Sequence, residues 1–319
     1  MTNLSLNFET AMEKAREEVD RVLLSAPILI RTYTSHLTLT HGKFIRARAV
    51  LACGMDEEGC VHSDAVVFAA AIELLHLATL VHDDIMDDAA LRRGVATLQK
   101  KFGKRTAVIC GDYLLAAALK EFSRIEDTEK YKNLNPSNYV GQICMGELRQ
   151  SANNFNYQLS MFRYLSIING KTAALFEASY FAGAAVVEQE EKRLRLYRRL
   201  GRYTGIIFQL TDDCIDYECD TKTAGKSVQS DYEQGVITLP VIHAFYHSPE
   251  LKKRAEAGEL STEELLAEVR KSGGVDFTHK TAGRYYEKAL TALKELHFPA
   301  LKEALLIELL DKAYYGLKK

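Results

Sequence analysis

The chain has 319 residues, 47% of them hydrophobic, and its 41 Lys and Arg nearly balance its 43 Asp and Glu. The net charge of −2 excludes a global field that would recruit nucleic acid or an anionic membrane. Six cysteines without CxxC pairs, no secretory leader and no apolar run of about 20 residues predict a cytoplasmic protein without a membrane-inserted segment.

The first predicted elements are an amphipathic helix over residues 8–24 and an apolar helix over 44–54. Gly42, Lys43 and Arg46 stand at the start of the second helix. A glycine followed by two cations at a helix start can hold phosphate oxygens through backbone N–H groups and side chains together. The plain alternative is that these cations are solvated.

One helix is predicted over residues 63–88, because a Ser-Asp pair can cap its start and an apolar run without Gly or Pro follows. It ends in the pattern Asp-Asp-x-x-Asp, formed by Asp83, Asp84 and Asp87. At about 100° per residue, His76 shares one stripe of this helix with Asp83 and Asp87. Acidic groups on an apolar helix are costly unless a cation offsets them, so we expect a cationic ligand here.

The chain leaves this helix through a basic loop with Arg92 and Arg93, which either contact phosphate oxygens or pair with the neighbouring carboxylates. A helix over residues 101–124 follows. At Gly170 one helix breaks, and Lys171-Thr172 opens the next. Lys171 can neutralise phosphate, whereas Thr172 can simply cap the helix.

A second carboxylate-bearing helix, over residues 192–217, repeats the arrangement. It carries Gln209, Asp212, Asp213 and Asp216 at helical spacing and forms a second Asp-Asp-x-x-Asp. Oxygen ligands without Cys favour Mg²⁺, which keeps several waters and bridges carboxylates to substrate phosphates. Solvated acidic helix ends are the alternative, but two copies of the pattern after apolar runs favour a metal-bound diphosphate.

Polar, turn-rich residues 223–235, which include Lys226, indicate a loop or lid. Helices over 262–271 and 277–296 follow, the first after a Ser-x-x-Glu capping box. Because strand-like alternation is nearly absent and no linker separates the elements, we expect one all-α domain over residues 1–319. Its ten or more helices would surround a central cavity that both acidic helix ends face.

These residues resemble the motifs of the trans-isoprenyl diphosphate synthases, also called polyprenyl synthetases, above all those of bacterial medium- and long-chain enzymes of the heptaprenyl type. The similar motifs occur in family order: Gly42–Arg46, His76–Asp87, Arg92–Gly94, Gly111–Tyr113, Gly170–Ala173, Gln209–Asp216, Gly225-Lys226, Asp231 and Gly235–Pro240. The family's Gly-Gly-Lys-Arg-x-Arg-Pro is His-Gly-Lys-Phe-Ile-Arg-Ala here, and the lid stretch lacks the family's Pro and Gly. The resemblance implies the isoprenoid synthase fold and a homodimer, and it leaves open a small regulatory second subunit.

By this resemblance the chain condenses isopentenyl diphosphate with an allylic diphosphate and uses three Mg²⁺ ions. The implied metal ligands are Asp83, Asp87 and Asp212, supported by Asp84, Asp213 and Asp216. The implied contacts of the allylic substrate are Arg92, Lys171, Gln209 and Lys226, and those of isopentenyl diphosphate are Lys43, Arg46, His76 and Arg93. The dipoles of Thr172 and Gln209 are expected to stabilise the allylic carbocation.

Product length is expected to depend on the side chains that precede Asp83. Ala78 and Thr79 are small, whereas relatives that stop at farnesyl or geranylgeranyl often carry an aromatic residue at one of these positions. We therefore expect a tunnel that extends to Leu75 or deeper and a product longer than geranylgeranyl. The alternatives are that Ala78 only permits close helix packing, and that the enzyme is a short-chain synthase.

Three other functions fit these residues less well. A class I terpene cyclase shares the acidic ionisation site but does not need Lys43, Arg46 and Arg93 for a second diphosphate. His82-Asp83 is also typical of HD-type metal phosphohydrolases, which require further metal-binding histidines. A non-catalytic partner subunit would not need two intact acidic motifs.

Overall fold

The structure is a computed structural model that describes residues 5–40, 42–125, 130–131, 133–218 and 230–316. It is 77% helical, so the prediction of an all-α protein with ten or more helices is confirmed. The strands among these residues are two short antiparallel pairs, β1 (Ser5–Leu6) with β2 (Val61–His62) and β3 (Leu91–Arg92) with β4 (Val95–Ala96).

The helices follow one another along the whole described chain. The earlier ones are α1 (Phe8–Leu24), α2 (Ile28–Leu37), the 3₁₀ turn η1 (Thr38–Thr40), α3 (Ile45–Cys53), α4 (Ser63–Met86), α5 (Leu98–Phe102), α6 (Lys104–Phe122), α7 (Pro136–Ser151) and α8 (Met161–Ile168). The later ones are the π-helical turn η2 (Asn169–Ala173), α9 (Ala174–Val187), α10 (Glu191–Glu218), α11 (Ser230–Glu233), α12 (Leu239–His247), α13 (Pro249–Glu256), α14 (Thr262–Lys271), α15 (Gly274–Leu296) and α16 (Ala300–Tyr315).

Most predicted boundaries agree with the structure to within a few residues. The helix predicted over 8–24 is α1, and the capping box is present at the start of α14, where Ser261 and Glu264 exchange side-chain to backbone hydrogen bonds. Residues 101–124 hold the predicted helix, which is α6 and contains Gly111–Tyr113. The end of α5 just before it was not predicted, and the two helices are separate because Gly103 has a φ of 88°, which a right-handed helix cannot include.

The described residues belong to two compact units. The first contains residues 1–136, 178–198 and 296–306, and the second contains residues 137–177, 199–295 and 307–319. Helices α9, α10 and α16 contribute residues to both units. The prediction of a single domain, and that of one cavity faced by both acidic helix ends, stay predictions.

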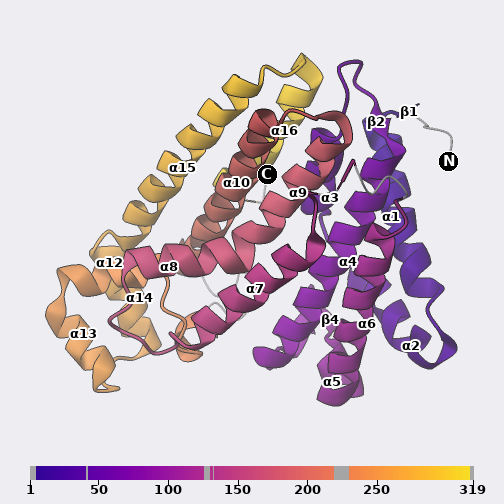
Figure 1. Cartoon of the computed structure of the whole chain (residues 1–319). Coiled ribbons are helices and arrows are strands. Elements are labelled where there is room, and N and C mark those ends of the chain that lie inside the picture. The colour runs from indigo at the N-terminus through magenta and orange to yellow at the C-terminus, as the bar shows by residue number, and fades with distance from the viewer. Residues whose placement is uncertain (1–4, 41, 126–129, 132, 219–229, 317–319) are drawn as a thin grey trace. The chain divides into compact units, whose positions relative to one another are not determined.

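Helix α4 is the centre of the first unit and packs against α1, α3 and α6 (Figure 1). It is apolar around most of its circumference, which is typical of a buried helix, and Phe68 and Leu74 on it are almost fully covered. By length and composition alone α4 could cross a membrane, contrary to the expectation that no apolar run approaches that length. However, 67% of its most apolar window is buried inside the protein, as in the core helix of a folded domain.

A buried lysine of α16 caps the carbonyl end of α3. The Lys302 ammonium donates to Cys53 O at 2.7 Å and to Met55 O at 2.9 Å. Its Nζ also lies 5.3 Å from the ring centroid of Tyr197 and 5.0 Å from that of Phe298. Burial lowers the pKa of Lys302 to about 8. The unsatisfied carbonyl groups that end a helix thus find a donor 249 positions later in the chain.

The core of the second unit is built from α8, α10, α12, α14 and α15, with Leu210, Leu239 and Leu265 fully buried at its centre. Helix α10 lies against the π-helical turn η2 because position 205 is a glycine. A Cβ on Gly205 would lie 2.6 Å from Ala173 Cα, which is closer than real side chains approach. The second carboxylate motif begins at Asp212, about two turns further along α10.

Candidate active site

The first carboxylate motif lies at the carboxyl end of α4. Asp83 and Asp84 belong to its last turn, and Asp87 is its C-cap residue. Asp84 is buried, and its Oδ1 accepts hydrogen bonds from Arg92 Nε at 2.8 Å and Arg92 Nη2 at 2.7 Å. Asp83 is half-buried and Asp87 is exposed. Arg92 therefore forms the ion pair with a neighbouring carboxylate that was one of its two predicted roles. The more accessible carboxylates of the motif are Asp83 and Asp87.

A second group of polar side chains lies between α3 and α4. Arg46 Nη1 donates to His76 Nε2 at 3.0 Å, and because a guanidinium cannot accept, this ring nitrogen carries no proton. Burial, and then the charge of Arg46, lowers the pKa of His76 well below its usual 6.5. Burial also lowers the pKa of Arg46 to about 10 and raises the pKa of Glu73, which accepts from Ala47 N at 2.9 Å. The pair thus presents one cation and one neutral imidazole.

Arg93 lies beside the glycine that was predicted to approach phosphate. A Cβ on Gly42 would lie 3.0 Å from each terminal nitrogen of Arg93, so the absence of a side chain lets the guanidinium reach the backbone. The charge of Arg93 also acts on Glu73 and His76, which places it in the same neighbourhood. Lys43, the next residue along the chain, is exposed.

Phe44 stands where the resembling family has a cation. It is the N-cap residue of α3, with φ 53° and ψ 38° in the left-handed region, and its ring is buried. The Arg16 guanidinium of α1 lies 5.2 Å from the centroid of that ring. The substitution therefore replaces a charged side chain at the helix start with one that packs into the first unit.

The Gly-Asp-Tyr motif of α6 holds a histidine of α4. A Cβ on Gly111 would lie 2.4 Å from His82 Nε2, so only glycine leaves room for the ring. The same nitrogen lies 3.3 Å from Asp112 Oδ1. His82 is therefore oriented by an aspartate. The histidine cluster that the alternative of an HD-type phosphohydrolase requires is absent from the part of the chain that the structure describes.

The second carboxylate motif is organised by a chain of hydrogen bonds in the second unit. Thr172 Oγ1 donates to Gln209 Oε1 at 2.6 Å, and Gln209 Nε2 donates to Asp213 Oδ1 at 2.7 Å. Tyr164 donates its hydroxyl hydrogen to Asp213 Oδ2. Asp213 is buried, whereas Asp212 is exposed. Tyr164 was not predicted, because a single tyrosine in an apolar run carries no periodic or motif signal.

Lys171 belongs to the π-helical turn η2 and pairs with α7. Its Nζ lies 2.8 Å from Glu147 Oε2 and donates to Oε1 at 3.1 Å. The backbones of the two elements touch beside this pair, since a Cβ on Gly146 would lie 2.3 Å from Lys171 N and 2.6 Å from Gly170 C. A π-helical turn is uncommon and often marks a functional position.

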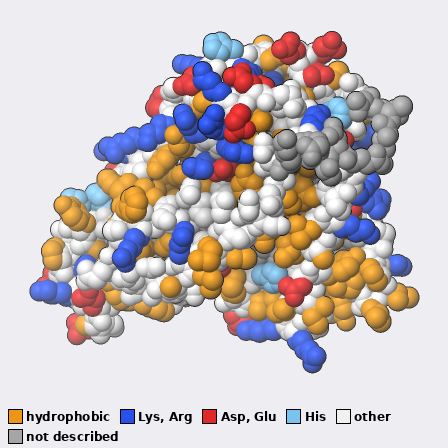
Figure 2. All heavy atoms as spheres, viewed as in Figure 1, with side chains coloured by type: hydrophobic (Ala, Val, Ile, Leu, Met, Phe, Trp, Pro, Cys, Tyr) orange, Lys and Arg blue, Asp and Glu red, His pale blue; other side chains and the backbone are white. Residues whose placement is uncertain are grey.

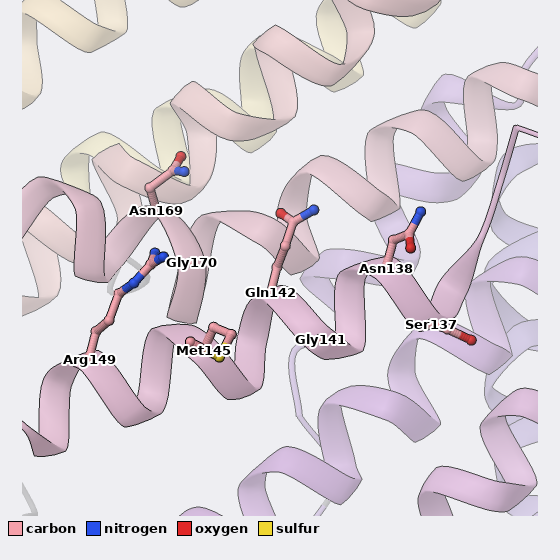
Figure 3. Close-up of a pocket in the computed structure, with 8 residues that line it drawn as sticks. All are labelled: Ser137, Asn138, Gly141, Gln142, Met145, Arg149, Asn169 and Gly170. Carbon is pink, nitrogen blue, oxygen red and sulfur yellow. The ribbon is translucent and has the colours of Figure 1, made fainter.

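A pocket of about 430 Å³ lies on the neighbouring face of α7 (Figure 3). Its lining comes from α7 and η2: Ser137, Asn138, Gly141, Gln142, Met145, Arg149, Asn169 and Gly170. Arg149 is its one charged lining residue. None of the predicted site residues lines it, so it is not the predicted substrate cavity.

The three predicted chain-length residues lie on α4. Leu75 and Ala78 are buried, at 3% and 2% exposure. Thr79 Oγ1 donates to His76 O at 2.7 Å, so its hydroxyl is engaged by its own helix. The small side chain at position 78 thus lies in a covered part of the first unit.

The predicted metal ligands are carboxylates throughout. The side chain of Asp216 and all of Lys226 lie outside the described residues. Among the side chains that are described, no three of His, Cys, Asp or Glu converge closely enough to form a metal cage. Each motif by itself offers carboxylate oxygens, and such oxygens, with water and diphosphate oxygens, are how proteins usually hold Mg²⁺.

Comparison with known proteins agrees with this chemistry. The model of the polyprenyl synthetase family matches residues 28–271. Heptaprenyl diphosphate synthase component 2 of Bacillus subtilis (strain 168) is 32% identical over 88% of this chain and 80% of that protein. The octaprenyl diphosphate synthase of Escherichia coli (strain K12) is 35% identical, with 83% of each chain covered. The crystal structure of heptaprenyl diphosphate synthase from Staphylococcus aureus has a TM-score of 0.88 and 30% identity, covering 98% of this chain and 99% of that one. The resemblance is confirmed: this chain belongs to the polyprenyl synthetase family.

Proposed function

We propose that this chain is a Mg²⁺-dependent prenyltransferase that condenses isopentenyl diphosphate with an allylic diphosphate and releases pyrophosphate. One observation carries the proposal: in both carboxylate motifs, the two adjacent aspartates differ in burial in the same way. In each pair the second carboxylate, Asp84 or Asp213, is buried and held by side chains, whereas the first, Asp83 or Asp212, is more exposed. A held carboxylate fixes the helix end, and its neighbour remains accessible to a cation.

The proposed Mg²⁺ ligands are Asp83, Asp87 and Asp212, with Asp216 in support and three ions in the substrate complex. Bound Mg²⁺ supplies positive charge that stabilises the departing diphosphate. Arg92 adds a fixed cation, because a guanidinium has five N–H donors and Asp84 engages only Nε and Nη2. Lys171 adds another, and Glu147 holds it on η2 until the diphosphate arrives.

The second substrate requires its own set of donors. We assign Lys43, Arg46, His76 and Arg93 to the diphosphate of isopentenyl diphosphate. His76 acts there as a neutral donor through Nδ1, since its Nε2 accepts from Arg46 and its pKa is lowered.

The reaction breaks the allylic C–O bond and leaves a carbocation, whose C1 is then attacked by the double bond of isopentenyl diphosphate. The new C–C bond forms, and the departing pyrophosphate takes the proton that restores the double bond. The oxygens of Thr172 and Gln209 are the dipoles assigned to stabilise the cation. Their mutual hydrogen bond, and that from Gln209 to Asp213, fixes their orientation before the charge develops.

We further propose that the product is longer than geranylgeranyl. The small Ala78, five residues before Asp83, supports this proposal because no large side chain stops the tail there. The relatives described above, which are heptaprenyl and octaprenyl diphosphate synthases, support it as well.

We propose that the enzyme works in the cytoplasm as a homodimer. Large apolar side chains are exposed on α6, at Val108 and Ile109, and on α7, at Met145 and Leu148, and such exposure supports contacts between copies. The Bacillus subtilis relative is named component 2 of its synthase, which supports a search for a small second subunit as well. The molar mass of the purified chain in solution tests the dimer directly.

The proposal is tested by incubating the purified chain with Mg²⁺, labelled isopentenyl diphosphate and, in turn, geranyl, farnesyl and geranylgeranyl diphosphate, and by sizing the products. We expect chains longer than geranylgeranyl. Products no longer than farnesyl or geranylgeranyl diphosphate would support the proposed reaction and contradict the proposed product length. Loss of the allylic substrate without consumption of isopentenyl diphosphate would identify a cyclase.

Two variants test whether the accessible carboxylates affect catalysis without affecting the stability of the fold. Asp83→Asn and Asp212→Asn should each lower the condensation rate by about 100-fold or more, because each removes charge that is needed where the diphosphate departs. Both residues lie near the surface, so the thermal unfolding midpoint should change little. An unchanged condensation rate in both variants would contradict the assignment of Asp83 and Asp212 as Mg²⁺ ligands.

A further inference from the structure

Acidic residues are absent from two long stretches of the first unit. No Asp or Glu occurs between Asp20 and Asp56, where five Lys and Arg occur, or between Asp88 and Asp112, where six occur. Both signs are nearly equal in number over the whole chain, so its charge is segregated along the sequence. A net charge of −2 therefore coexists with a strongly basic part of the protein.

Several of these cations are not neutralised by the protein. Arg92 and Lys104 have carboxylate partners. The exposed cations that have no carboxylate within ion-pair distance, as far as the described residues extend, are Arg31, Lys100, Lys101 and Arg105. They come from α2, α5 and the first turn of α6. Their charge is therefore available to a partner outside the protein.

Large apolar side chains are exposed where α1 meets α2. Leu24 ends α1 with 52% of its surface exposed, and Ile28 and Leu29 begin α2 with 80% and 89% exposed. Single exposed apolar residues are ordinary, but a contiguous group with this exposure marks an interaction surface.

The apolar corner and the cations belong to the same end of the first unit. Helix α2 packs on α1 and on α5. The ring of Tyr33 lies 5.0 Å from that of Phe102, and Lys101 Nζ donates to His36 Nδ1 at 3.2 Å. Figure 1 shows α2 and α5 at one end of the unit, and Figure 2 shows hydrophobic side chains gathered over α2. We name this surface, from Leu24, Ile28, Leu29, Arg31, Lys100 and Arg105, the basic apolar end.

We propose that the basic apolar end docks on the surface of a bilayer that contains anionic phospholipids. Apolar side chains that project from a surface enter the boundary between head groups and acyl chains, and Lys and Arg beside them are attracted by anionic head groups. Neither feature alone binds a membrane stably, whereas the two together supply both attractions. The docking itself stands on this surface, and only its purpose, delivery of an apolar product to the bilayer, rests on the proposed function.

The chemistry of this surface favours a lipid over a protein or a nucleic acid. A protein partner usually meets charges of both signs at the rim of an interface, whereas Asp88 is paired with Lys104 here, and Arg31, Lys101 and Arg105 have no carboxylate within ion-pair distance among the described residues. A nucleic acid would be met by cations and stacking rings, and not by three projecting aliphatic side chains. Projecting aliphatic groups at the same end of the unit as an excess of cations match an anionic bilayer.

The first experiment uses the absence of tryptophan from the chain, which makes a single introduced tryptophan a specific probe. Leu29→Trp is compared with Phe162→Trp, an equally projecting control on α8 with 83% exposure. Vesicles of phosphatidylcholine with phosphatidylglycerol should shift the emission of Leu29→Trp to shorter wavelength and leave Phe162→Trp unchanged. Vesicles of phosphatidylcholine alone should produce a much smaller shift.

The second experiment measures vesicle sedimentation of the full chain in the absence of substrates. Ile28→Ser with Leu29→Ser should weaken binding at least about tenfold. Lys100→Gln with Arg105→Gln should weaken it about tenfold and reduce its dependence on salt. The matched control, Phe162→Ser with Lys253→Gln, changes one exposed apolar and one exposed basic residue elsewhere and should bind as the wild type does.

The outcomes decide the proposal. No binding of the wild type to anionic vesicles, or equal losses in the control and in Ile28→Ser with Leu29→Ser, would overturn it. A change in molar mass in solution caused by Ile28→Ser with Leu29→Ser, without vesicle binding by the wild type, would instead assign the surface to a protein contact. Because no substrate is present, failure here is distinguishable from failure of the condensation assay.

Discussion

Tyr164 is a buried residue that we place behind the second carboxylate motif, where its hydroxyl donates to Asp213. Tyr164→Phe keeps the ring and removes the donor, so Asp213 loses a hydrogen bond and Gln209 loses a fixed neighbour. We expect a destabilisation of about 1–3 kcal/mol in urea unfolding, together with a condensation rate lowered about tenfold.

A matched tyrosine separates these two effects. Tyr131 is also buried, and its hydroxyl donates to Asp64 at 2.8 Å in the first unit. Tyr131→Phe should cost comparable stability and leave the condensation rate close to that of the wild type. Equal losses of rate in both variants would show that Tyr164 has no specific positioning role.

His76 gives a prediction on pH. Its pKa is lowered in the folded state, mainly by burial, so the unfolded chain takes up a proton at this position before the folded chain does. The contribution of His76 to stability is therefore complete above the unfolded pKa of about 6.5 and declines as the pH falls below it. Urea unfolding at several pH values between about 5 and 7.5 should show a shallower decline for His76→Gln than for the wild type. A steeper decline in the variant would contradict the assignment of a neutral His76.

At the scale of single residues, sequence reasoning found the side chains that repeat or belong to motifs. The stripe of His76 and Asp83 follows from helical spacing alone. Sequence reasoning could not predict that Asp84 is buried against Arg92 while Asp83 is more exposed, because the sequence does not give the burial of two adjacent aspartates. The role of Tyr164 was not predicted either, because its partner Asp213 lies 49 positions away in the sequence.

The contact between α7 and η2 is the element whose geometry bears most closely on Lys171. Gly146→Ala would place a methyl group 2.3 Å from Lys171 N, so the two backbones must separate. We expect a loss of about 1–3 kcal/mol and a lower condensation rate, because the ion pair with Glu147 spans the same contact.

Gly141→Ala on the same helix is the natural comparison. A Cβ on Gly141 meets nothing within 4 Å, so this variant should gain roughly 0.5–1 kcal/mol from helix propensity. Urea unfolding of both variants measures the difference. If Gly146→Ala were as stable as Gly141→Ala, the close approach of α7 to η2 would be wrong.

At the scale of elements, the sequence predicted those with a continuous pattern and a clear cap. Helices α1 and α14 were placed from amphipathic spacing and a capping box. The break between α5 and α6 was missed, because Gly103 stands between two helix-compatible runs and the sequence does not show that its φ is positive. The close contacts at Gly146 and Gly205 could not be predicted either, because a glycine in the sequence does not show which element packs against it.

For the whole molecule, Lys302 joins the last long helix to the third and gives a test at high pH. Its folded pKa of about 8 lies below the usual 10.5, so the unfolded chain binds more protons between these values. The free energy of unfolding that Lys302 contributes therefore increases as the pH rises from about 8 towards 10.5. Lys302→Met removes this increase, and it should also cost about 1–3 kcal/mol at neutral pH by leaving two buried carbonyl groups without a donor.

The control for that measurement is Lys312→Met, a lysine of the same helix whose ion pair with Glu308 is partly exposed. Its unfolding free energy should keep the pH dependence of the wild type. A parallel pH dependence of Lys302→Met and wild type would mean that the lysine titrates normally in the folded protein.

The fold class and the family could be predicted for the whole chain, because composition, helical spacing and ordered motifs all act over many residues. The segregation of charge was missed, because net charge is a sum that hides where the signs lie. The arrangement of the two acidic motifs relative to each other could not be derived, since periodicity fixes faces within a helix and not distances between helices.

The π-helical turn η2 has a consequence for insertions and deletions. Such a turn holds one residue more than an α-helical turn, and each α-helical residue rotates the side chains that follow by about 100°. Deleting one residue of this turn before Thr172 would restore a regular helix and turn Thr172 away from Gln209. Natural variants of this protein should therefore tolerate substitutions in this turn more readily than any change in its length.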